Sequence, residues 1–265
     1  MATRSLPQSP RNDRKAKLYT SLNSTTEKVS NVLSWFPSKS AKRCIKKKSA
    51  THDFSTISNY TPSNIWSKSI TANYQALESL SISNTGIPLY IEKCIDFIEN
   101  NQGFDQEGLY RIPGNQNHLA ELEKSYLETG IFNVSAFDSP VHVVATALKS
   151  FFSSLPESLI PVEYHKNFKT VVDINDNEQK IKTLKKSVLL LPLINQSILR
   201  YLLEHFKKVS CSPKTAMNSN NLSKVWSPTL FRPSFDSYLE LSSGMFEFQV
   251  VLEVMITNVV LLFSE

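Results

Sequence analysis

Apolar residues recur at helical spacing through the last two thirds of the chain, and this pattern limits the fold more than any other feature. The first such helical face, at positions i, i+3, i+4 and i+7, carries Ile91, Cys94, Ile95 and Ile98. Later segments repeat the spacing with Leu119, Leu122 and Tyr126; Val141, Val144, Ala145, Leu148 and Phe152; Ile181, Leu184, Val188 and Leu191; and Ile198, Leu202, Phe206 and Val209. No stretch shows sustained strand alternation, and the chain has only six glycines. The pattern therefore predicts an all-α domain built as a single helical bundle.

Three further segments refine this expectation. Ser139-Pro140 is typical of a helix start, because serine caps the end and proline suits the first turn. Residues 221–226 predict a short helix. The segment from Phe246 to Phe263 is very apolar but contains Glu247 and Glu253. A carboxylate in the middle of a membrane span is unfavourable, so we interpret this segment as a buried final helix of the domain.

Charge divides the chain into two parts. The first 60 residues contain 12 of the 29 Lys and Arg residues but only three of the 24 Asp and Glu residues. Residues 1–83 are also rich in Ser, Thr and Asn, and their apolar residues are too sparse to bury a core. We therefore predict a mostly disordered basic arm over residues 1–83 and a folded domain over residues 84–265.

A dense basic cluster lies within the arm and consists of Lys42, Arg43, Lys46, Lys47 and Lys48. Such a cluster favours contact with anionic lipid or nuclear import, and the alternative is a solvated basic tail. The three cysteines are widely spaced and form no CxxC pair, which is typical of a reduced, cytoplasmic setting. The expected location is thus the cytoplasm, with recruitment to the inner face of the plasma membrane through the basic cluster.

The motifs of most enzyme classes are missing from the sequence. It has no phosphate-binding G-x-x-x-x-G-K-[ST] loop, no G-x-G-x-x-G and no G-x-S-x-G, so the chain is not expected to hydrolyse nucleotides itself. The five histidines show no metal-ligand spacing and are assigned to the surface or the ordinary core, and His142, on a predicted amphipathic helix, is the one to check near a functional face. Basic residues of the folded part are scattered, so nucleic-acid binding is not expected. We therefore expect the chain to be a regulatory or interaction module.

Three separated segments carry a resemblance to a known family. They are E-G-L-Y-R-I-P-G at 107–114, A-L-K-S-F-F-S-S-L-P-E-S-L-I-P at 147–161, and N-N-L-S-K-V-W-S-P-T-L-F-R-P at 220–233. In this order and spacing they resemble the Rho GTPase-activating (Rho GAP) domain family. The sequences of these motifs, together with I-P-L-Y-I-E-K-C-I-D-F-I-E at 87–99, are most similar to those of large multidomain Rho GAPs that carry the domain at their C-terminal end.

The first segment places Arg111 in a predicted loop between two helices, flanked by Gly108 and by Pro113-Gly114. An arginine at such a tip can reach the phosphate site of another protein. The alternative from the residues alone is a helix-capping or surface-paired arginine. By the resemblance, Arg111 is an arginine finger supplied in trans, which stabilises the charge that develops on the transferred phosphoryl group.

The resemblance also assigns the supporting residues. Lys149 contributes at the GTPase-facing surface, and its helix should project it outward, whereas the alternative is a solvated lysine. Asn221 contacts the GTPase and helps to hold the finger loop, whereas the alternative is a plain helix N-cap. Pro228 matches the proline that ends the third-motif helix.

Several residues depart from the family pattern. Ser153 stands where some members carry a basic residue, and Pro113 replaces a common serine. In the third motif Lys224 stands at a usually apolar position, and Trp226-Ser227 replaces the usual pair. Because burying a lysine is unfavourable, we expect either a rotated helix or a Lys224 side chain that extends to solvent.

The resemblance implies a GTPase-activating protein that accelerates GTP hydrolysis by Rho- or Rac-type small GTPases in their GTP-bound form. It implies no cofactor or metal in this chain, since GTP and magnesium belong to the partner. The chain has no active site of its own and supplies a catalytic residue to the GTPase. The altered third motif leaves open a non-catalytic or weakly catalytic GTPase-binding module or scaffold.

Overall fold

The computed structural model describes residues 86–234 and 238–264. The predicted arm over residues 1–83 and its basic cluster lie outside these residues. The described elements are helices, in the order α5 (Leu89–Asn100), η1 (Gly103–Asp105), α6 (Gln116–Thr129), α7 (Pro140–Ser154), η2 (Val162–Tyr164), α8 (His165–Lys169), α9 (Asn177–Leu189), α10 (Leu193–Cys211), η3 (Pro213–Thr215), α11 (Ser219–Leu230), α12 (Tyr238–Thr257) and α13 (Val259–Leu262). The predicted all-α class is confirmed.

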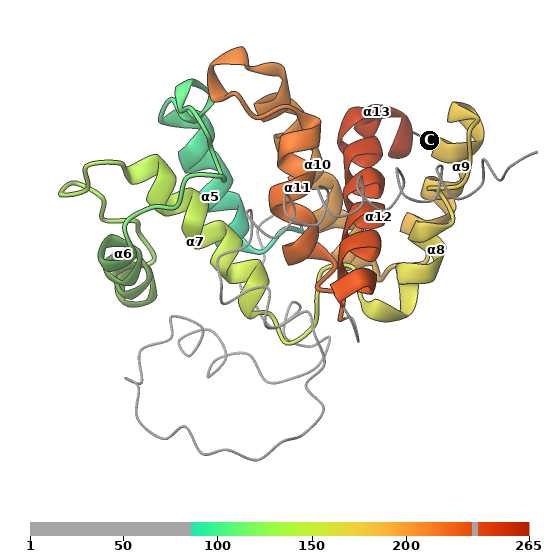
Figure 1. The fold of residues 1–265 in the computed structure, drawn as a ribbon. Coiled ribbons are helices and arrows are strands. Elements are labelled where there is room, and N and C mark those ends of the chain that lie inside the picture. Colours follow the sequence, from blue (N-terminus) through green and yellow to red (C-terminus); the bar gives the residue numbers. More distant parts are fainter. Residues whose placement is uncertain (1–85, 235–237, 265) are drawn as a thin grey trace, which may run out of the picture.

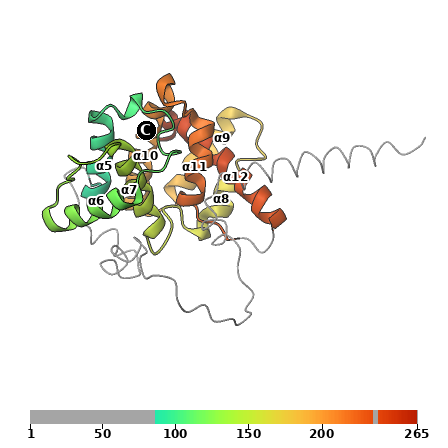
Figure 2. The same ribbon diagram turned by 60° about the vertical axis from the view of Figure 1, so that its left-hand side comes forward.

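The helices form a bundle with two ends (Figures 1 and 2). Helices α5, α6 and α7 pack together at one end, and α8, α9 and α13 lie at the other. Between them, α11 packs along α12 and also contacts α7 and α10. Helix α11 therefore lies in the middle of the bundle, between α7 of the first end and the two long helices α10 and α12.

The apolar faces predicted from the sequence form the core. All four residues of the first face are buried in α5, and so are the predicted faces of α7 and α10. In α7 the buried surface is wider than predicted, because Val143, Ala147 and Phe151 are buried as well. Helix α7 is enclosed on several sides by α5, α6 and α11. The predicted start of α7 is also confirmed, with Ser139 at the N-cap and Pro140 in the first turn.

Two helix predictions need correction. The apolar C-terminal segment is not one helix but two, because the chain breaks at Asn258, whose Nδ2 donates to the carbonyl of Val254. The third-motif helix is longer than predicted and does not end at Pro228, which lies inside α11 two residues before its end. Inside a helix a proline removes one backbone donor and its ring crowds the carbonyl four residues back, so other packing of α11 must offset this cost. Across residues 86–234 and 238–264, none of the helices combines the length and the hydropathy that a bilayer span requires.

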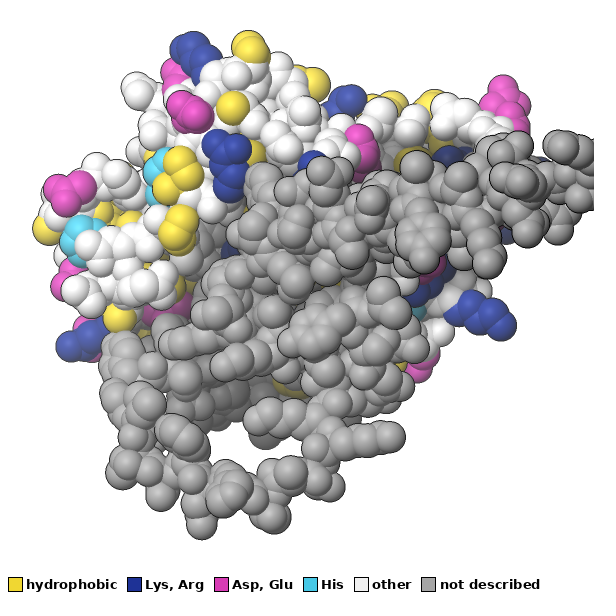
Figure 3. Space-filling model, viewed as in Figure 1, with side chains coloured by type: hydrophobic (Ala, Val, Ile, Leu, Met, Phe, Trp, Pro, Cys, Tyr) yellow, Lys and Arg dark blue, Asp and Glu magenta, His cyan; other side chains and the backbone are white. Residues whose placement is uncertain are grey.

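Charged side chains of both signs are interspersed on the face drawn in Figure 3. The described residues visible there show no broad basic patch. This arrangement agrees with the scattered Lys and Arg residues of the folded part.

Candidate functional site

Arg111 lies on a tight loop, residues 106–115, between η1 and α6; we call it the Arg111 loop. Its backbone folds back on Gly108, whose carbonyl accepts hydrogen bonds from the amides of Arg111 at 2.8 Å and Ile112 at 2.9 Å. Gly108 has φ +68° and Tyr110 has φ +70°, so two residues adopt the left-handed conformation within three positions. The loop predicted from Gly108 and Pro113-Gly114 is confirmed, and it presents Arg111 at the surface.

The Arg111 side chain has one weak partner. Its Nη2 atom lies 3.9 Å from Oε1 of Glu107, one turn back in sequence, and the Glu107 side chain is 76% exposed. An exposed ion pair at this distance contributes roughly 0–1 kcal/mol. The guanidinium can therefore leave Glu107 for a stronger anion at little energetic cost.

The N-terminal side of the Arg111 loop is held by the turn that precedes α11. The amide of Gly108 donates to the carbonyl of Thr215 at 2.7 Å. The Thr215 hydroxyl in turn donates to the Ser212 carbonyl and accepts from the Met217 amide, which fixes the turn. This link could not be predicted from the sequence, because no local pattern pairs residues so far apart in the chain.

Asn221 braces the same turn. Its Nδ2 donates to the carbonyl of Ala216 at 3.1 Å, one residue after Thr215. The N-cap of α11 is Asn218, whose side chain accepts from the Asn221 amide at 2.8 Å. Asn221 is therefore not the plain N-cap of the alternative reading. It acts on the Arg111 loop indirectly, through the turn to which Gly108 is bonded.

The C-terminal side of the Arg111 loop rests on α7. The amide of Gly114 donates to Oγ1 of Thr146 at 2.8 Å, and that hydroxyl donates to the carbonyl of His142. Gly114 lies so close to the helix that a Cβ atom would approach the Cα of Val143 to 2.5 Å. His142 lies beside the backbone of Ile112 in the Arg111 loop. Burial lowers the pKa of its ring, against the effect of that backbone contact.

Lys149 lies on α7 one turn after Thr146, on the helix that supports the Arg111 loop. It is half-buried rather than projected into solvent, so its predicted outward position is corrected. Burial lowers the pKa of Lys149 to about 8. No hydrogen bond or ion pair joins it to another described residue, which leaves its ammonium group available to a binding partner.

One altered residue of the third motif, Trp226, packs against Tyr110 of the Arg111 loop. Trp226 is buried, and its ring lies 5.1 Å from the Tyr110 ring and 4.8 Å from the Phe206 ring. Ser227 is also buried. Lys224 is half-buried, so it is not enclosed in the core. The exchange at Trp226 therefore fills the space under the Arg111 loop and leaves the surface position of Arg111 intact.

The two sides of the Arg111 loop are thus bonded to the turn that precedes α11, which carries Asn221, and to α7, which carries Lys149. The loop provides a cation at the surface, and α7 provides a second. Within the described residues, no group of three or more His, Cys, Asp or Glu side chains could hold a metal ion. The arrangement is suited to binding an anion that another molecule presents.

Comparisons with known proteins agree with this geometry. The family model described as the RhoGAP domain matches residues 88–235, more than half of the chain. Rho GTPase-activating protein 35 of Mus musculus is 36% identical over 171 residues, covering 64% of this chain and 11% of the relative. Rho GTPase-activating protein 24 of Mus musculus is 33% identical over 176 residues, covering 64% and 23%. The chain therefore spans only about a tenth to a quarter of the length of these curated relatives.

Solved structures show the same fold. The crystal structure of human Rho GTPase activating protein 15 superposes with a TM-score of 0.62 at 27% identity, covering 68% of this chain and 85% of that one. The BH domain from GRAF, the GTPase regulator associated with focal adhesion kinase, gives a TM-score of 0.60 at 25% identity and covers 68% and 96%. The resemblance seen in the three sequence motifs is confirmed, and the chain belongs to the RhoGAP domain family.

Proposed function

We propose that this chain accelerates GTP hydrolysis by a Rho-family small GTPase and that Arg111 is the residue it supplies to the partner's active site. The observation that carries the proposal is the presentation of Arg111. An exposed, weakly paired arginine stands on a loop whose backbone is fixed at both ends. The names of the relatives support the class of partner.

The chemistry follows from the charge of the reaction. Phosphoryl transfer spreads negative charge over the transferred group, and a positioned guanidinium stabilises that charge with a planar fork of donors. An arginine supplied in trans accelerates hydrolysis by roughly 10³–10⁵-fold, or about 4–7 kcal/mol. GTP and magnesium belong to the partner. Lys149 and Asn221 would contact the GTPase beside the finger, and Pro228 would contribute to the same surface.

Single-turnover GTP hydrolysis tests this proposal, with a panel of GTP-loaded Rho, Rac and unrelated small GTPases. The wild-type chain should stimulate a Rho-family member, and Arg111→Ala should abolish the stimulation. Arg111→Lys should restore little, because lysine lacks the donor fork. Arg200→Ala is a matched control, since Arg200 is also exposed and pairs with an acidic residue four positions away, Glu204. Full stimulation by Arg111→Ala would refute the finger assignment.

The second candidate is a module that holds a GTPase without stimulating it, which the altered residues of the third motif suggest. The two functions differ in their affinity for a mimic of the transition state. A working finger should strengthen binding to the GTPase with GDP and aluminium fluoride relative to GDP alone. Equal binding to the two forms would favour the non-catalytic module.

A further inference from the structure

Tyr110 and Arg111 are neighbours in the chain but lie in opposite surroundings. Arg111 is exposed, whereas Tyr110 is buried with 5% of its surface accessible. The Tyr110 ring packs edge-on against Trp226 of α11 and Phe206 of α10. The left-handed backbone of Tyr110 produces this reversal, a conformation that is uncommon for a residue other than glycine. Interactions with the interior must therefore hold the Tyr110 side chain inward.

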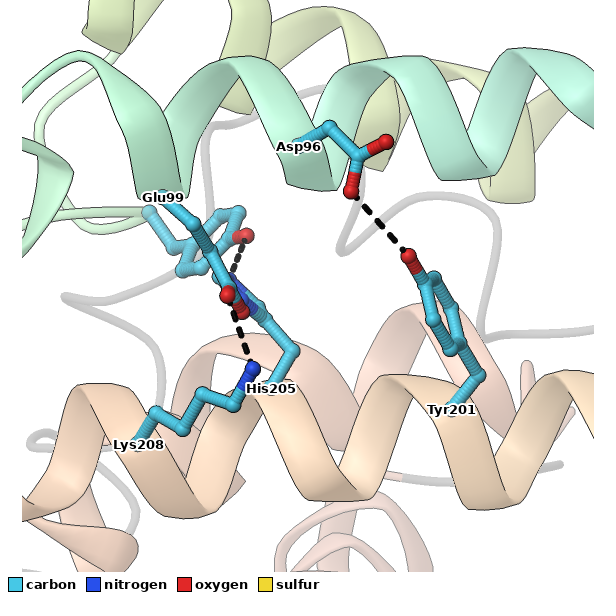
Figure 4. Close-up of polar contacts among 6 residues, drawn as sticks. Asp96, Glu99, Tyr201, His205 and Lys208 are labelled. Atoms are coloured by element: carbon cyan, nitrogen blue, oxygen red, sulfur yellow. Dashed lines mark hydrogen bonds and ion pairs between the residues drawn. The ribbon is translucent and has the colours of Figure 1, made fainter.

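A chain of hydrogen bonds leads inward from the Tyr110 hydroxyl. The hydroxyl lies 2.6 Å from Nε2 of His205, and Nδ1 of His205 lies 2.7 Å from Oε1 of Glu99 on α5. The other oxygen of Glu99 accepts from Nζ of Lys208 at 2.7 Å. Figure 4 shows that Glu99 on α5 lies between His205 and Lys208, which are both on α10. The Lys208 side chain is exposed. We call Tyr110, His205 and Glu99 the Tyr110 anchor.

Each donor in the Tyr110 anchor can be assigned. Desolvation raises the pKa of Glu99, but the hydrogen bonds from His205 and Lys208 outweigh it, so the pKa is lowered overall. Burial lowers the pKa of His205, although the hydrogen bond to Glu99 opposes this. An ionised Glu99 can only accept, so Nδ1 of a neutral His205 donates to it. Nε2 is then an acceptor, and the Tyr110 hydroxyl donates to it.

Replacement of any member would leave a buried polar atom without its partner. His205 is 1% exposed, and the Tyr110 ring is buried against the rings of His205 and Phe206, so water cannot easily substitute. The bond from Tyr110 to His205 therefore favours one inward position of the Tyr110 side chain. Since Arg111 follows directly, that position also fixes the direction in which the arginine leaves the loop.

We propose that the Tyr110 anchor positions Arg111 for the transition state, with Tyr110, His205 and Glu99 acting as positioning residues. This inference rests on the proposed GTPase-activating function. A finger that is misplaced by about 1 Å can lose on the order of 10²-fold in rate, whereas contacts elsewhere on the surface still bind the partner. Loss of the anchor should therefore reduce the rate at saturation more than the affinity.

Tyr110→Phe is the sharpest variant, because it removes only the hydroxyl and keeps the ring. In single-turnover hydrolysis at saturating activator, we expect the rate to fall by about tenfold or more. The half-saturating concentration should stay within about twofold of wild type, since binding of the ground state needs less accurate placement. A fall in affinity with an unchanged saturated rate would overturn the proposal.

Tyr201→Phe is a matched control. Tyr201 also lies on α10 and its hydroxyl reaches α5, where it donates to Asp96 at 3.5 Å (Figure 4). It joins the same two helices but does not touch the Arg111 loop. We expect Tyr201→Phe to keep both the wild-type rate and the wild-type affinity. An equal loss of rate in Tyr201→Phe and Tyr110→Phe would reduce the anchor to general stability and overturn the proposal.

His205 gives a second, independent test. His205→Gln preserves one donor and one acceptor at about the spacing of the two ring nitrogens, whereas His205→Leu preserves neither. We expect His205→Gln to retain most of the wild-type rate and His205→Leu to fall to the level of Tyr110→Phe. The double variant with Tyr110→Phe and His205→Leu should lose no more than either single variant, because the two act through one bond. Additive losses would contradict the proposal.

Arg111→Ala separates failure of this inference from failure of the proposed function. If Arg111→Ala abolishes stimulation while Tyr110→Phe matches wild type, the finger stands and the anchor is refuted. If Arg111→Ala stimulates fully, the proposed function itself fails. Thermal unfolding of each variant identifies a temperature at which all of them are folded. Rates compared at that temperature then report on the placement of Arg111.

Discussion

The backbone amide of Gly108 donates a 2.7 Å hydrogen bond to the carbonyl of Thr215, and this bond joins the Arg111 loop to the turn before α11. Asn221 braces that turn from the helix itself through the Ala216 carbonyl. The first and third motifs of the sequence are therefore linked by one short path of main-chain and amide contacts. This path explains how Asn221 can influence Arg111 although its side chain bonds to the turn and not to the loop.

Asn221→Ala removes the brace and should lower the free energy of unfolding by about 1 kcal/mol. It should also lower the stimulated hydrolysis rate, although by less than Arg111→Ala, because the turn keeps the Thr215 contacts. Asn218→Ala is the control, since loss of the α11 N-cap has a similar effect on stability, about 1 kcal/mol, without removing the Ala216 contact. Denaturant unfolding and single-turnover assays check both. Equal activity in the two variants would mean that Asn221 acts only on stability.

Gly114→Ala should displace the Arg111 loop from α7. The added Cβ would meet backbone atoms of Val143 at 2.5 Å and 2.6 Å, and backbone cannot move aside as a side chain can. We expect a loss of stability of about 1–3 kcal/mol together with a large loss of stimulation. Gly130→Ala is the control, because Gly130 has φ +70° but open space around it. It should lose about 1–2 kcal/mol from strain alone and keep its activity at temperatures where it is folded.

Lys149 should make the stability of the domain depend on pH. Burial lowers its pKa in the folded state from 10.5 to about 8, so between these values the unfolded chain binds more protons and stability rises with pH. Below pH 8 the half-buried Lys149 ammonium group is charged in the folded state, and this lowers the free energy of unfolding by its full amount. Lys149→Met should therefore be more stable than wild type at pH 7, by roughly 2 kcal/mol, and the difference should shrink as pH approaches 10.5.

Thermal unfolding from pH 7 to pH 10.5 measures this difference, with Lys186→Met at an exposed position of α9 as the control for the substitution. A gap between Lys149→Met and wild type that stays constant with pH would contradict the assignment. In the hydrolysis assay the same variant should lose affinity for the GTPase, because it removes a cation from the proposed binding surface.

Pro228→Ala tests whether this proline serves the partner or the helix. Alanine restores the backbone donor that proline lacks inside α11, so we expect a gain in stability of about 1 kcal/mol after the greater freedom of the unfolded chain is counted. If Pro228 contributes to the GTPase-binding surface, the half-saturating concentration should rise while the saturated rate holds. Unchanged affinity would remove Pro228 from the binding surface.

The helices could be predicted from the sequence because their apolar spacing is a local property. The first face of α5 and the faces of α7 and α10 are buried as expected. The loop around Arg111 was also predictable, since Gly108 and Pro113-Gly114 mark turns by their own backbone preferences. In these cases the residues that determine the structure lie within one or two turns of one another.

The errors have a different physical origin. The family resemblance placed Pro228 at the end of the third-motif helix, but α11 packs on α12 and α7 and continues past it. The sequence pattern placed Lys149 away from its apolar neighbours, yet it gave no information about the surrounding elements that half-bury it. The bond between Tyr110 and His205 joins residues 95 positions apart. Such contacts depend on how helices pack, and spacing within one helix does not reveal them.

The bond between Gly108 and Thr215 also has a consequence during protein synthesis. Arg111 leaves the ribosome about 100 residues before Thr215, which at roughly 5–20 residues per second is about 5–20 seconds. Throughout that interval the nascent chain already exposes its arginine, but the carbonyl that secures the loop has not yet been made. Under the proposed function, a partially synthesised chain would be a poor activator, and competence would arise only after the helix that carries Asn221 has docked.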